Sequence, residues 1–399
     1  MERQYKDSGI EWIGKIPETW EVTKLNTLYT QRIEKVSDKD YPPLSVTMQG
    51  ILPQLENAAK TNNGDDRKLV RVGDFAINSR SDRRGSCGIS PYEGSVSLIN
   101  TILKPRGEMN PRFYNWLFHS SLFSDEFYKW GHGIVDDLWT TRWQEMRNIT
   151  VPSPTLAVQQ RIADYLDEKC GEIDSLIGLQ EQMIEKLKAY KQSVITEAVT
   201  KGLNPNAKLV SSGIDWIGEI PEGWEVSKLK YYIKVDSGDA ITNEHLTESG
   251  LYPVYGGGEI MGYYPKYNTE EGSLIIGRVG ARCGCVTLPT GKSWASDNAL
   301  IVKTTWFLKF VYYLLQGANL NRLNTSNAQP LITATKIKNI HVPIIEISEQ
   351  QAIASYLDGK CSEIDKLIDV KQKKIEKLKD YKKSVIYEAV TGKTDLRDN

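Results

Sequence analysis

The chain has 399 residues, of which 25% are charged and 40% hydrophobic, and its formal net charge is −1. This length exceeds what one hydrophobic core usually organises, and the balanced charge excludes a uniformly basic protein, so any nucleic-acid surface must be local. No stretch nears the roughly 18 apolar residues of a membrane span, and the charged N-terminal segment lacks the apolar core of a secretion signal. Five cysteines, an odd set, favour reduced thiols and a cytoplasmic location.

Two pairs of segments repeat along the chain. Residues 8–25 match residues 212–229 at 14 of 18 positions, and residues 159–200 match residues 350–391 at 28 of 42 positions. Each half therefore consists of a short Trp-rich segment, a divergent block and a long helical segment that ends in Glu-Ala-Val-Thr. The order predicts a ring of two units, cut open at Met1, with a pseudo-twofold axis.

The divergent blocks contain short runs rich in Val, Ile and Tyr that Gly and Pro interrupt, which predicts mixed α and β structure. We expect an α+β protein, in which two mixed α/β globular domains are joined by two long antiparallel helices that form a coiled coil. The expected parts are a first domain at 1–152, a first spacer helix at 153–203, a second domain at 204–343, a second spacer helix at 344–393 and a tail at 394–399.

Apolar residues in the helical segments recur at near-heptad spacing, in a stripe three columns wide. Leu176, Met183 and Tyr190 take position d in this assignment. Gln180 and its repeat mate Lys371 interrupt position a, and they are interpreted either as polar register pins or as solvated side chains. The residues expected to pack between the helices are Leu166, Ile173, Leu187, Val194, Leu357, Ile364, Leu378 and Val385.

Basic and amide side chains gather near the expected strand ends of both blocks. Arg and Lys bind phosphates and guanine edges, and Asn and Gln pair with adenine, so this mixture suits contact with duplex DNA. Surface ion pairs and turn-satisfying amides are the alternative explanation for each such residue. The candidates for DNA binding are Asn78, Arg80, Arg83, Arg84, His132, Arg142, Arg278, Arg282, Arg322, Asn324, Asn327 and Gln329.

The sequence gives little support for a catalytic or cofactor site. It has no phosphate-binding G-x-x-x-x-G-K-[ST] motif and no dinucleotide-binding fingerprint. No second histidine stands at metal-ligand spacing, and the Cys283-x-Cys285 pair has no partner pair. We therefore expect a non-catalytic protein with no cofactor and no metal.

The segments Gly-Ile-Glu-Trp-Ile-Gly-Lys-Ile-Pro and Gly-Ile-Asp-Trp-Ile-Gly-Glu-Ile-Pro, the Ile-x-Val-Pro run into a helix with a Gln-Gln pair, and the two Glu-Ala-Val-Thr endings resemble the specificity subunit of type I restriction-modification systems. The resemblance covers the whole chain. It implies that each block is a target recognition domain for one half of a bipartite, asymmetric DNA site. It also implies that the helices set the spacing and dock two methyltransferase subunits, with a restriction subunit as a further partner. Asn327 to Pro330 is similar to the loop before the last helix of such a domain.

Two other classes of protein stay open at this point. One is a coiled-coil adaptor whose end domains bind proteins, and the other is a two-domain enzyme with an unrecognised site. A DNA reader that neutralises several phosphates loses affinity steeply as salt rises, whereas a protein adaptor needs no DNA and an enzyme turns over substrate alone.

Overall fold

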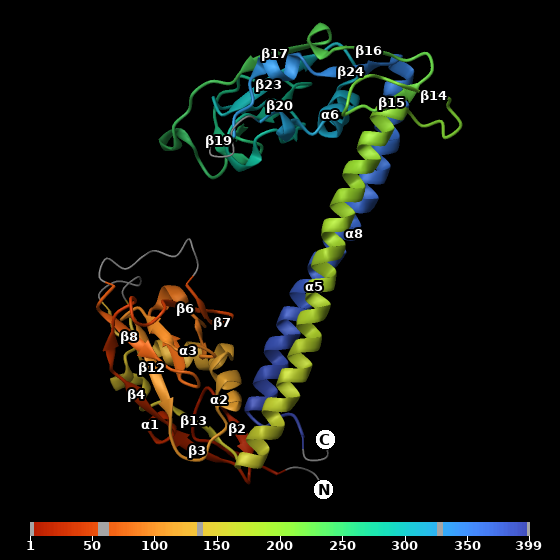
Figure 1. The fold of residues 1–399 in the computed structure, drawn as a ribbon. Helices are drawn as coiled ribbons and strands as arrows, with labels where there is room; N and C mark the ends of the chain where they lie inside the picture. The colour runs from red at the N-terminus through yellow and green to blue at the C-terminus, as the bar shows by residue number, and fades with distance from the viewer. Residues whose placement is uncertain (1–3, 55–63, 134–138, 325–329, 397–399) are drawn as a thin grey trace. The chain divides into compact units, whose positions relative to one another are not determined.

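The computed structural model describes residues 4–54, 64–133, 139–324 and 330–396. They fall into two compact units (Figure 1), one made of residues 1–180 with 373–399 and the other of residues 181–372. Each unit therefore combines one globular domain with a stretch of both long helices.

The first unit contains a four-stranded antiparallel sheet in the order β10-β9-β12-β4 and a three-stranded sheet in the order β11-β8-β5. The hairpin β6-β7 and the pairs β1-β2 and β13-β3 complete its strands. The strands are β1 Tyr5–Asp7, β2 Lys15–Pro17, β3 Glu21–Lys24, β4 Tyr29–Arg32, β5 Lys35–Val36, β6 Leu44–Thr47, β7 Gly50–Pro53, β8 Arg67–Val70, β9 Phe75–Asn78, β10 Cys87–Ile89, β11 Gly94–Val96, β12 Asn100–Pro105 and β13 Thr150–Ser153. The short helices are α1 Leu25–Leu28, η1 Ser81–Arg83, α2 Pro111–Phe118, α3 Ser121–Lys129 and α4 Trp143–Met146.

Strand β9 shows why the four-stranded sheet is covered on both faces. Side chains alternate between the faces of a strand. Phe75 and Ile77 accordingly join the large core cluster that contains α2 and α3, whereas Ala76 joins a smaller cluster with Ile51 and Val70. All four residues of β9 are buried, so this strand is the centre of the domain.

The second unit repeats this plan with a four-stranded antiparallel sheet in the order β17-β23-β20-β21 and a three-stranded sheet in the order β19-β18-β22, in which β18 and β22 are parallel. Its strands are β14 Leu209–Ser211, β15 Glu219–Pro221, β16 Glu225–Lys228, β17 Ile233–Ser237, β18 Tyr252–Tyr255, β19 Ile260–Tyr264, β20 Leu274–Gly277, β21 Val286–Thr287, β22 Trp294–Ala295, β23 Ala299–Thr304 and β24 His341–Ile344. The short helices are η3 Leu229–Tyr231, η4 Asn243–His245, η5 Gly280–Arg282, α6 Leu308–Gly317, η6 Leu320–Leu323 and α7 Ala334–Lys338.

The repeat extends through the divergent blocks. The sheet β4-β12-β9-β10 of the first unit corresponds strand by strand to β17-β23-β20-β21 of the second. Likewise β13-β3 corresponds to β24-β16, and the β1-β2 pair to β14-β15. The expected α+β fold with an internal repeat is confirmed.

The two long helices are α5, Leu156–Lys201, and α8, Ile347–Val390. In the first unit the N-terminal part of α5 packs antiparallel to the C-terminal part of α8, with Ile162 and Leu166 in the same core as Val385 and Ala389. In the second unit Val194 shares a core with Leu357. Gly202, with φ 71°, and Gly392, with φ 75°, follow the last turns in the left-handed conformation typical of helix ends.

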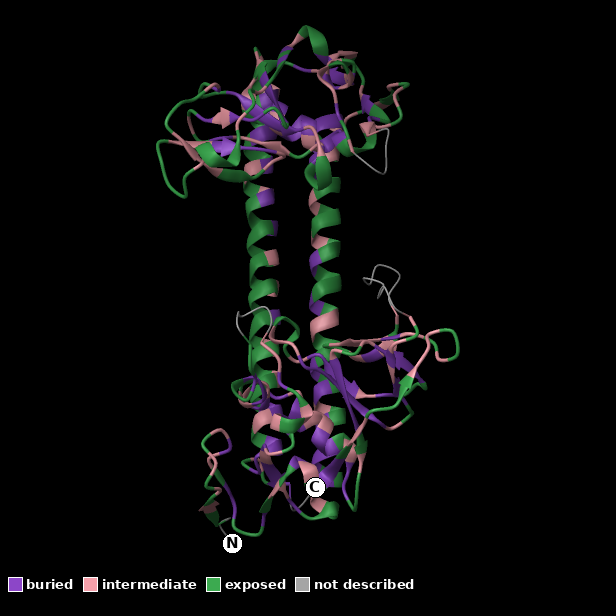
Figure 2. Cartoon of the chain, turned by 90° about the vertical axis from the view of Figure 1, so that its left-hand side faces the viewer, coloured by how far each residue is buried: buried purple, intermediate pink, exposed green. Residues whose placement is uncertain are grey.

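The buried seam of the helices differs from the expected assignment. Of the eight expected packing residues, six are buried, and Leu187 and Leu378 are half-buried. The expected d residues are exposed, at 43% for Leu176, 43% for Met183 and 57% for Tyr190. The seam instead follows the 4–3 spacing of Leu166, Cys170 and Ile173. A pair of helices buries about two columns of side chains, so the third column of this stripe stays uncovered; much of the mid-helix surface is coloured exposed in Figure 2.

Candidate functional site

The turn between β9 and β10 carries the first group of candidate DNA-binding residues. Asn78 is buried, and its Oδ1 accepts a hydrogen bond from the Arg80 backbone N–H at 3.0 Å, so this side chain shapes the turn. Arg83 is 68% exposed, with Nε 3.6 Å from Asp82. Arg84 is exposed as well, lies over the Tyr128 ring at 5.0 Å and pairs with Asp125 at 3.2 Å.

A segment far along the chain crosses this turn. The backbone of Thr140 bridges both Arg80 and His132, and the Thr141 N–H donates to the Ser79 carbonyl at 3.0 Å. Arg142, one residue further on, is exposed at the start of α4. The structure therefore brings the turn that carries four candidates beside the segment that links His132 to Arg142, although the turn and this segment are far apart in sequence.

A hollow of about 710 Å³ lies beside this turn. Its aromatic walls are Tyr128 and Trp139, and charged groups from Asp82, Arg84 and Lys129 surround them. Asp125 also lines the hollow, so its two acidic and two basic side chains balance. Arg84 and Lys129 are the lining groups that could contact a phosphate.

The second unit has the equivalent turn between β20 and β21. Val279 bridges Leu331, as Arg80 bridges Thr140, and the Ile332 N–H donates to the Arg278 carbonyl at 2.9 Å. Arg282 ends the short helix η5 just as Arg83 ends η1. Arg282 is 52% exposed and forms an ion pair with Glu259.

The remaining second-block candidates have other surroundings. Arg322 lies over the Trp216 ring at 5.3 Å, and burial lowers the pKa of its guanidinium. Asn324 accepts through Oδ1 from the Leu331 N–H at 3.2 Å. Arg278 has its Nε buried without a hydrogen-bond partner within the described ranges. Asn327 and Gln329 lie outside the described residues.

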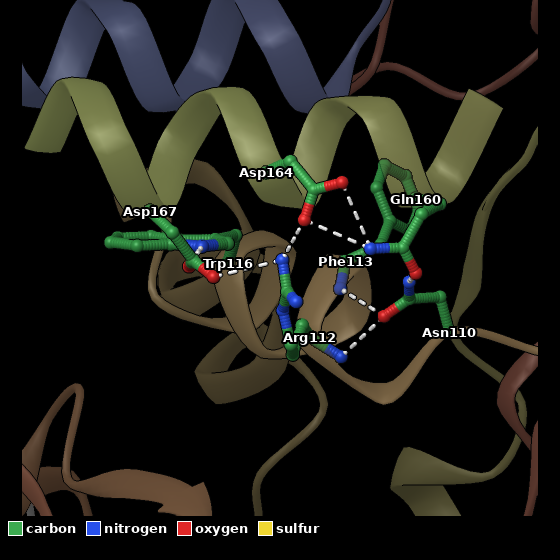
Figure 3. A network of polar contacts seen from close by, with 7 residues as sticks. All are labelled: Asn110, Arg112, Phe113, Trp116, Gln160, Asp164 and Asp167. Atoms are coloured by element: carbon green, nitrogen blue, oxygen red, sulfur yellow. Dashed lines mark hydrogen bonds and ion pairs between the residues drawn. The ribbon is translucent and has the colours of Figure 1, made fainter. Parts of the chain in front are cut away.

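Sequence reasoning missed the polar network that joins the first domain to α5 (Figure 3). Asn110 caps α2 by accepting from the Arg112 N–H at 2.9 Å, and its amide donates to Gln160 Oε1 at 2.6 Å. Arg112 forms ion pairs with Asp164 and, at 2.9 Å, with Asp167. Hydrogen bonds from Gln160 and Arg112 lower the pKa of the Asp164 carboxyl. One feature of the sequence could have indicated this contact between domain and helix: Gln159 and Asp167 are identical to their repeat mates Gln350 and Asp358.

Two further properties bear on the kind of protein. Among the described residues, no group of three or more His, Cys, Asp or Glu side chains is arranged to hold a metal ion. In the same part of the chain, none of the helices combines the length and apolar character needed to cross a bilayer.

The chain is similar to proteins of known class. Residues 221–380 match the family described as "Type I restriction modification DNA specificity domain". The chain is 25% identical to the type I restriction enzyme MjaVIII specificity subunit of Methanocaldococcus jannaschii, over 96% of this chain and 95% of that protein. It is 32% identical to the EcoprrI specificity subunit of Escherichia coli over 29% of each chain.

A solved structure has a similar fold over nearly the whole chain. A chain described under "Structural basis underlying complex assembly and conformational transition of the type I R-M system" superposes with a TM-score of 0.71 at 14% identity. The superposition covers 95% of this chain and 99% of the solved chain. The likeness extends over both domains and both long helices.

A repeated scaffold that carries two different domains, with equivalent turns bearing exposed arginines, defines a modular recognition subunit. The matches to specificity subunits of type I restriction-modification systems, which extend over 96% of this chain, support such a subunit with a DNA sequence-specificity function. The alternative of a coiled-coil adaptor that binds only proteins is not favoured.

Proposed function

We propose that each globular domain reads one half of a bipartite, asymmetric DNA target. The single observation that carries the proposal is the pair of equivalent turns at β9-β10 and β20-β21, which share a backbone plan while most of their side chains differ. Arg83 and Arg282 occupy the same place in the two turns. A shared frame with different side chains suits two domains that approach DNA alike and read different bases.

The proposal includes the domain boundaries 1–152, 153–203, 204–343, 344–393 and 394–399. The long helices would set the distance between half-sites, because a helix has a fixed rise per residue. Among the candidate residues, the exposed arginines are the ones we expect to contact phosphates or base edges. The buried Asn78 would support the turn that presents them.

Docking of two methyltransferase subunits is supported by the uncovered column of the helices. In the first unit Leu176 and Tyr381 of this column are exposed, and in the second unit Met183 and Leu367 are exposed. Large apolar side chains repeated along an exposed face are typical of a protein-binding surface. The chain itself would be non-catalytic, so methylation and any cleavage would belong to its partners, in the cytoplasm. The cytoplasmic location is supported by five cysteines that form no disulfide.

The experiment is to express the chain with its methyltransferase subunit and map the methylated adenines, beside cells that lack this chain. We expect methylation only with the chain present, in a motif of two unlike specific parts separated by unspecified bases. A symmetric motif, or methylation that does not depend on the chain, would refute the proposal. Binding of the assembled complex to the mapped duplex should weaken steeply as salt rises.

A further inference from the structure

Gln159 ties the first domain to helix α5 through a buried side chain. Its Oε1 accepts from the Asn110 backbone N–H at 2.8 Å, and its Nε2 donates to the Pro154 carbonyl at 2.8 Å. Gln159 is 3% exposed. One amide therefore joins the start of the domain helix α2 to the segment that leads into the spacer helix.

The second unit repeats this arrangement with different domain residues. Gln350 Oε1 accepts from the Phe307 backbone N–H at 2.9 Å, and its Nε2 donates to the Ile345 carbonyl at 3.0 Å. Gln350 is 2% exposed. Because the contact on the domain side is a backbone N–H at the start of a helix, it does not depend on which side chain stands there.

A second contact lies eight residues further along each spacer helix. Asp167 accepts from Trp116 Nε1 at 2.7 Å and pairs with Arg112 at 2.9 Å. Its mate Asp358 accepts from the Tyr313 hydroxyl at 2.8 Å and from Lys309 Nζ at 2.6 Å. The acceptor is identical in the two units, whereas the donors have changed.

The spacing of the donors explains how different domains fit one acceptor. Arg112 and Trp116 are four residues apart on α2, and Lys309 and Tyr313 are four residues apart on α6, so each pair lies on one face of its helix. The Tyr313 hydroxyl is a donor at neutral pH, and burial, and after it Asp358, raises its pKa further. A cation and a neutral N–H or O–H donor at this spacing satisfy one carboxylate.

Two points of attachment fix the orientation of the domain helix on the spacer helix, whereas one point would let the domain helix pivot. Eight helical residues separate the Gln and Asp contacts by roughly 12 Å along the spacer helix. A domain helix held by hydrogen bonds at both points is prevented from pivoting about either one.

We propose that Gln159 with Asp167, and Gln350 with Asp358, are positioning residues that fix the angle at which each recognition domain leaves the spacer helices, and thereby the gap between half-sites that the complex accepts. The inference rests on the proposed function. It adds a compatibility rule: a domain fits the scaffold if its helix offers a free N–H at the start and two donors four residues apart.

The first attachment site carries a carboxylate whose repeat mate in the second unit is not acidic. Asp164, which binds Arg112 and Gln160, has Ser355 as its repeat mate. The first attachment site therefore has a further carboxylate. Removing its Gln and Asp should release the first domain less completely than the same change releases the second.

The test uses the full chain assembled with its methyltransferase subunits and a set of duplexes carrying the mapped half-sites with the native gap or gaps one or two base pairs longer or shorter. The variants are Gln159→Ala with Asp167→Ala, and Gln350→Ala with Asp358→Ala. The matched controls are Glu168→Ala and Ser355→Ala, which change exposed residues of the same helices. We expect the preference for the native gap to fall roughly tenfold in the Gln350 and Asp358 double variant and by a smaller factor in the Gln159 and Asp167 double variant. The half-site bases should be unchanged in both, and the preference should stay constant in the controls.

Asp167→Asn provides a conservative variant, because its amide oxygen still accepts from Trp116 while the ion pair with Arg112 is lost. Its gap preference should lie between those of the wild type and the double variant. Hydrogen exchange gives a readout without DNA: the Asn110 amide should exchange faster in Gln159→Ala, and the Phe307 amide faster in Gln350→Ala. Activity that falls equally on all gaps, in proportion to lost folded protein, would overturn the positioning role. A wild-type complex with no bipartite target would refute the proposed function instead.

Discussion

Lys382 donates from Nζ to both carboxylate oxygens of Asp174 at 2.7 Å, and its repeat mate Lys191 donates to both oxygens of Asp365 at 2.8 and 2.6 Å. Each pair joins α5 to α8 within one unit. The two lysines are 191 positions apart, and so are the two aspartates. The two ion pairs are therefore equivalent contacts of the repeat. In each unit the ion pair joins one half of α5 to the opposite half of α8, as expected for an antiparallel helix pair.

These ion pairs should contribute little to stability. The carboxylates of Asp174 and Asp365 are 57% and 55% exposed, so water screens the attraction. Lys382→Met or Lys191→Met should each lower the free energy of unfolding by less than about 1 kcal/mol, measured by denaturant titration. A loss of several kcal/mol in either variant would show that the pair determines helix register.

Gly202 should resist substitution. Its φ of 71° favours glycine, and an added Cβ would lie 3.1 Å from Glu349 Oε1 and 3.2 Å from Trp224 Cζ2. Gly202→Ala should destabilise the protein by about 1–2 kcal/mol in thermal or denaturant unfolding. Gly359→Ala is the matched control, since Gly359 lies inside α8 with open space around it. That change should stabilise by roughly 0.5–1 kcal/mol, and a similar loss in both variants would contradict the argument.

Gln180 is a buried polar residue in the helix seam. It is 6% exposed, and its Oε1 has no hydrogen-bond partner within the part of the chain that the structure describes. A buried unsatisfied acceptor costs about 1–3 kcal/mol. Exchanging Gln180 and its mate Lys371 for Leu should therefore raise the melting temperature, measured by calorimetry. A marked fall would reject the hypothesis that the two are polar register pins kept at a cost to stability.

The repeat made the two long helices and the order of parts in each half predictable, because segments of closely similar sequence fold alike. The seam was harder to predict. Leu176 and Met183 satisfy a heptad as well as Ile177 and Ile184 do, and only the packing of the partner helix decides which column it covers. The sequence alone does not reveal that choice.

The candidate site shows the same limit. Arg83 and Arg282 could be found because a strand-turn pattern precedes each, and they proved equivalent in the structure. Asn78 satisfies the same pattern but is buried. Side-chain direction in a turn depends on dihedral angles and on the crossing segment near Thr140, which lies far away in sequence.

Arg83 and Arg282 should contribute to DNA affinity through charge. Arg83→Ala and Arg282→Ala should each weaken binding of the assembled complex, and each should reduce the slope of log affinity against log salt by about 1 if one phosphate contact is lost. Arg106→Ala is the control. Strand β12 begins near the turn, where Asn100 pairs with Asn78. Arg106 is exposed and follows the other end of this strand, away from the turn. An unchanged slope in both turn variants would mean that these arginines do not contact phosphate.

The proposed role of the helices in spacing predicts how the target responds to helix length. One heptad inserted after Gln180 in α5 and one after Gln372 in α8 would lengthen each helix by roughly 10 Å, because the rise is about 1.5 Å per residue. At about 3.4 Å per base pair, the gap between half-sites should widen by about three base pairs. Methylation mapping in cells would measure the new gap, and the half-site sequences should stay the same. An insertion in α5 alone should disrupt the seam and abolish methylation. A complex that carries both insertions and still methylates the original gap would show that the distance is set elsewhere.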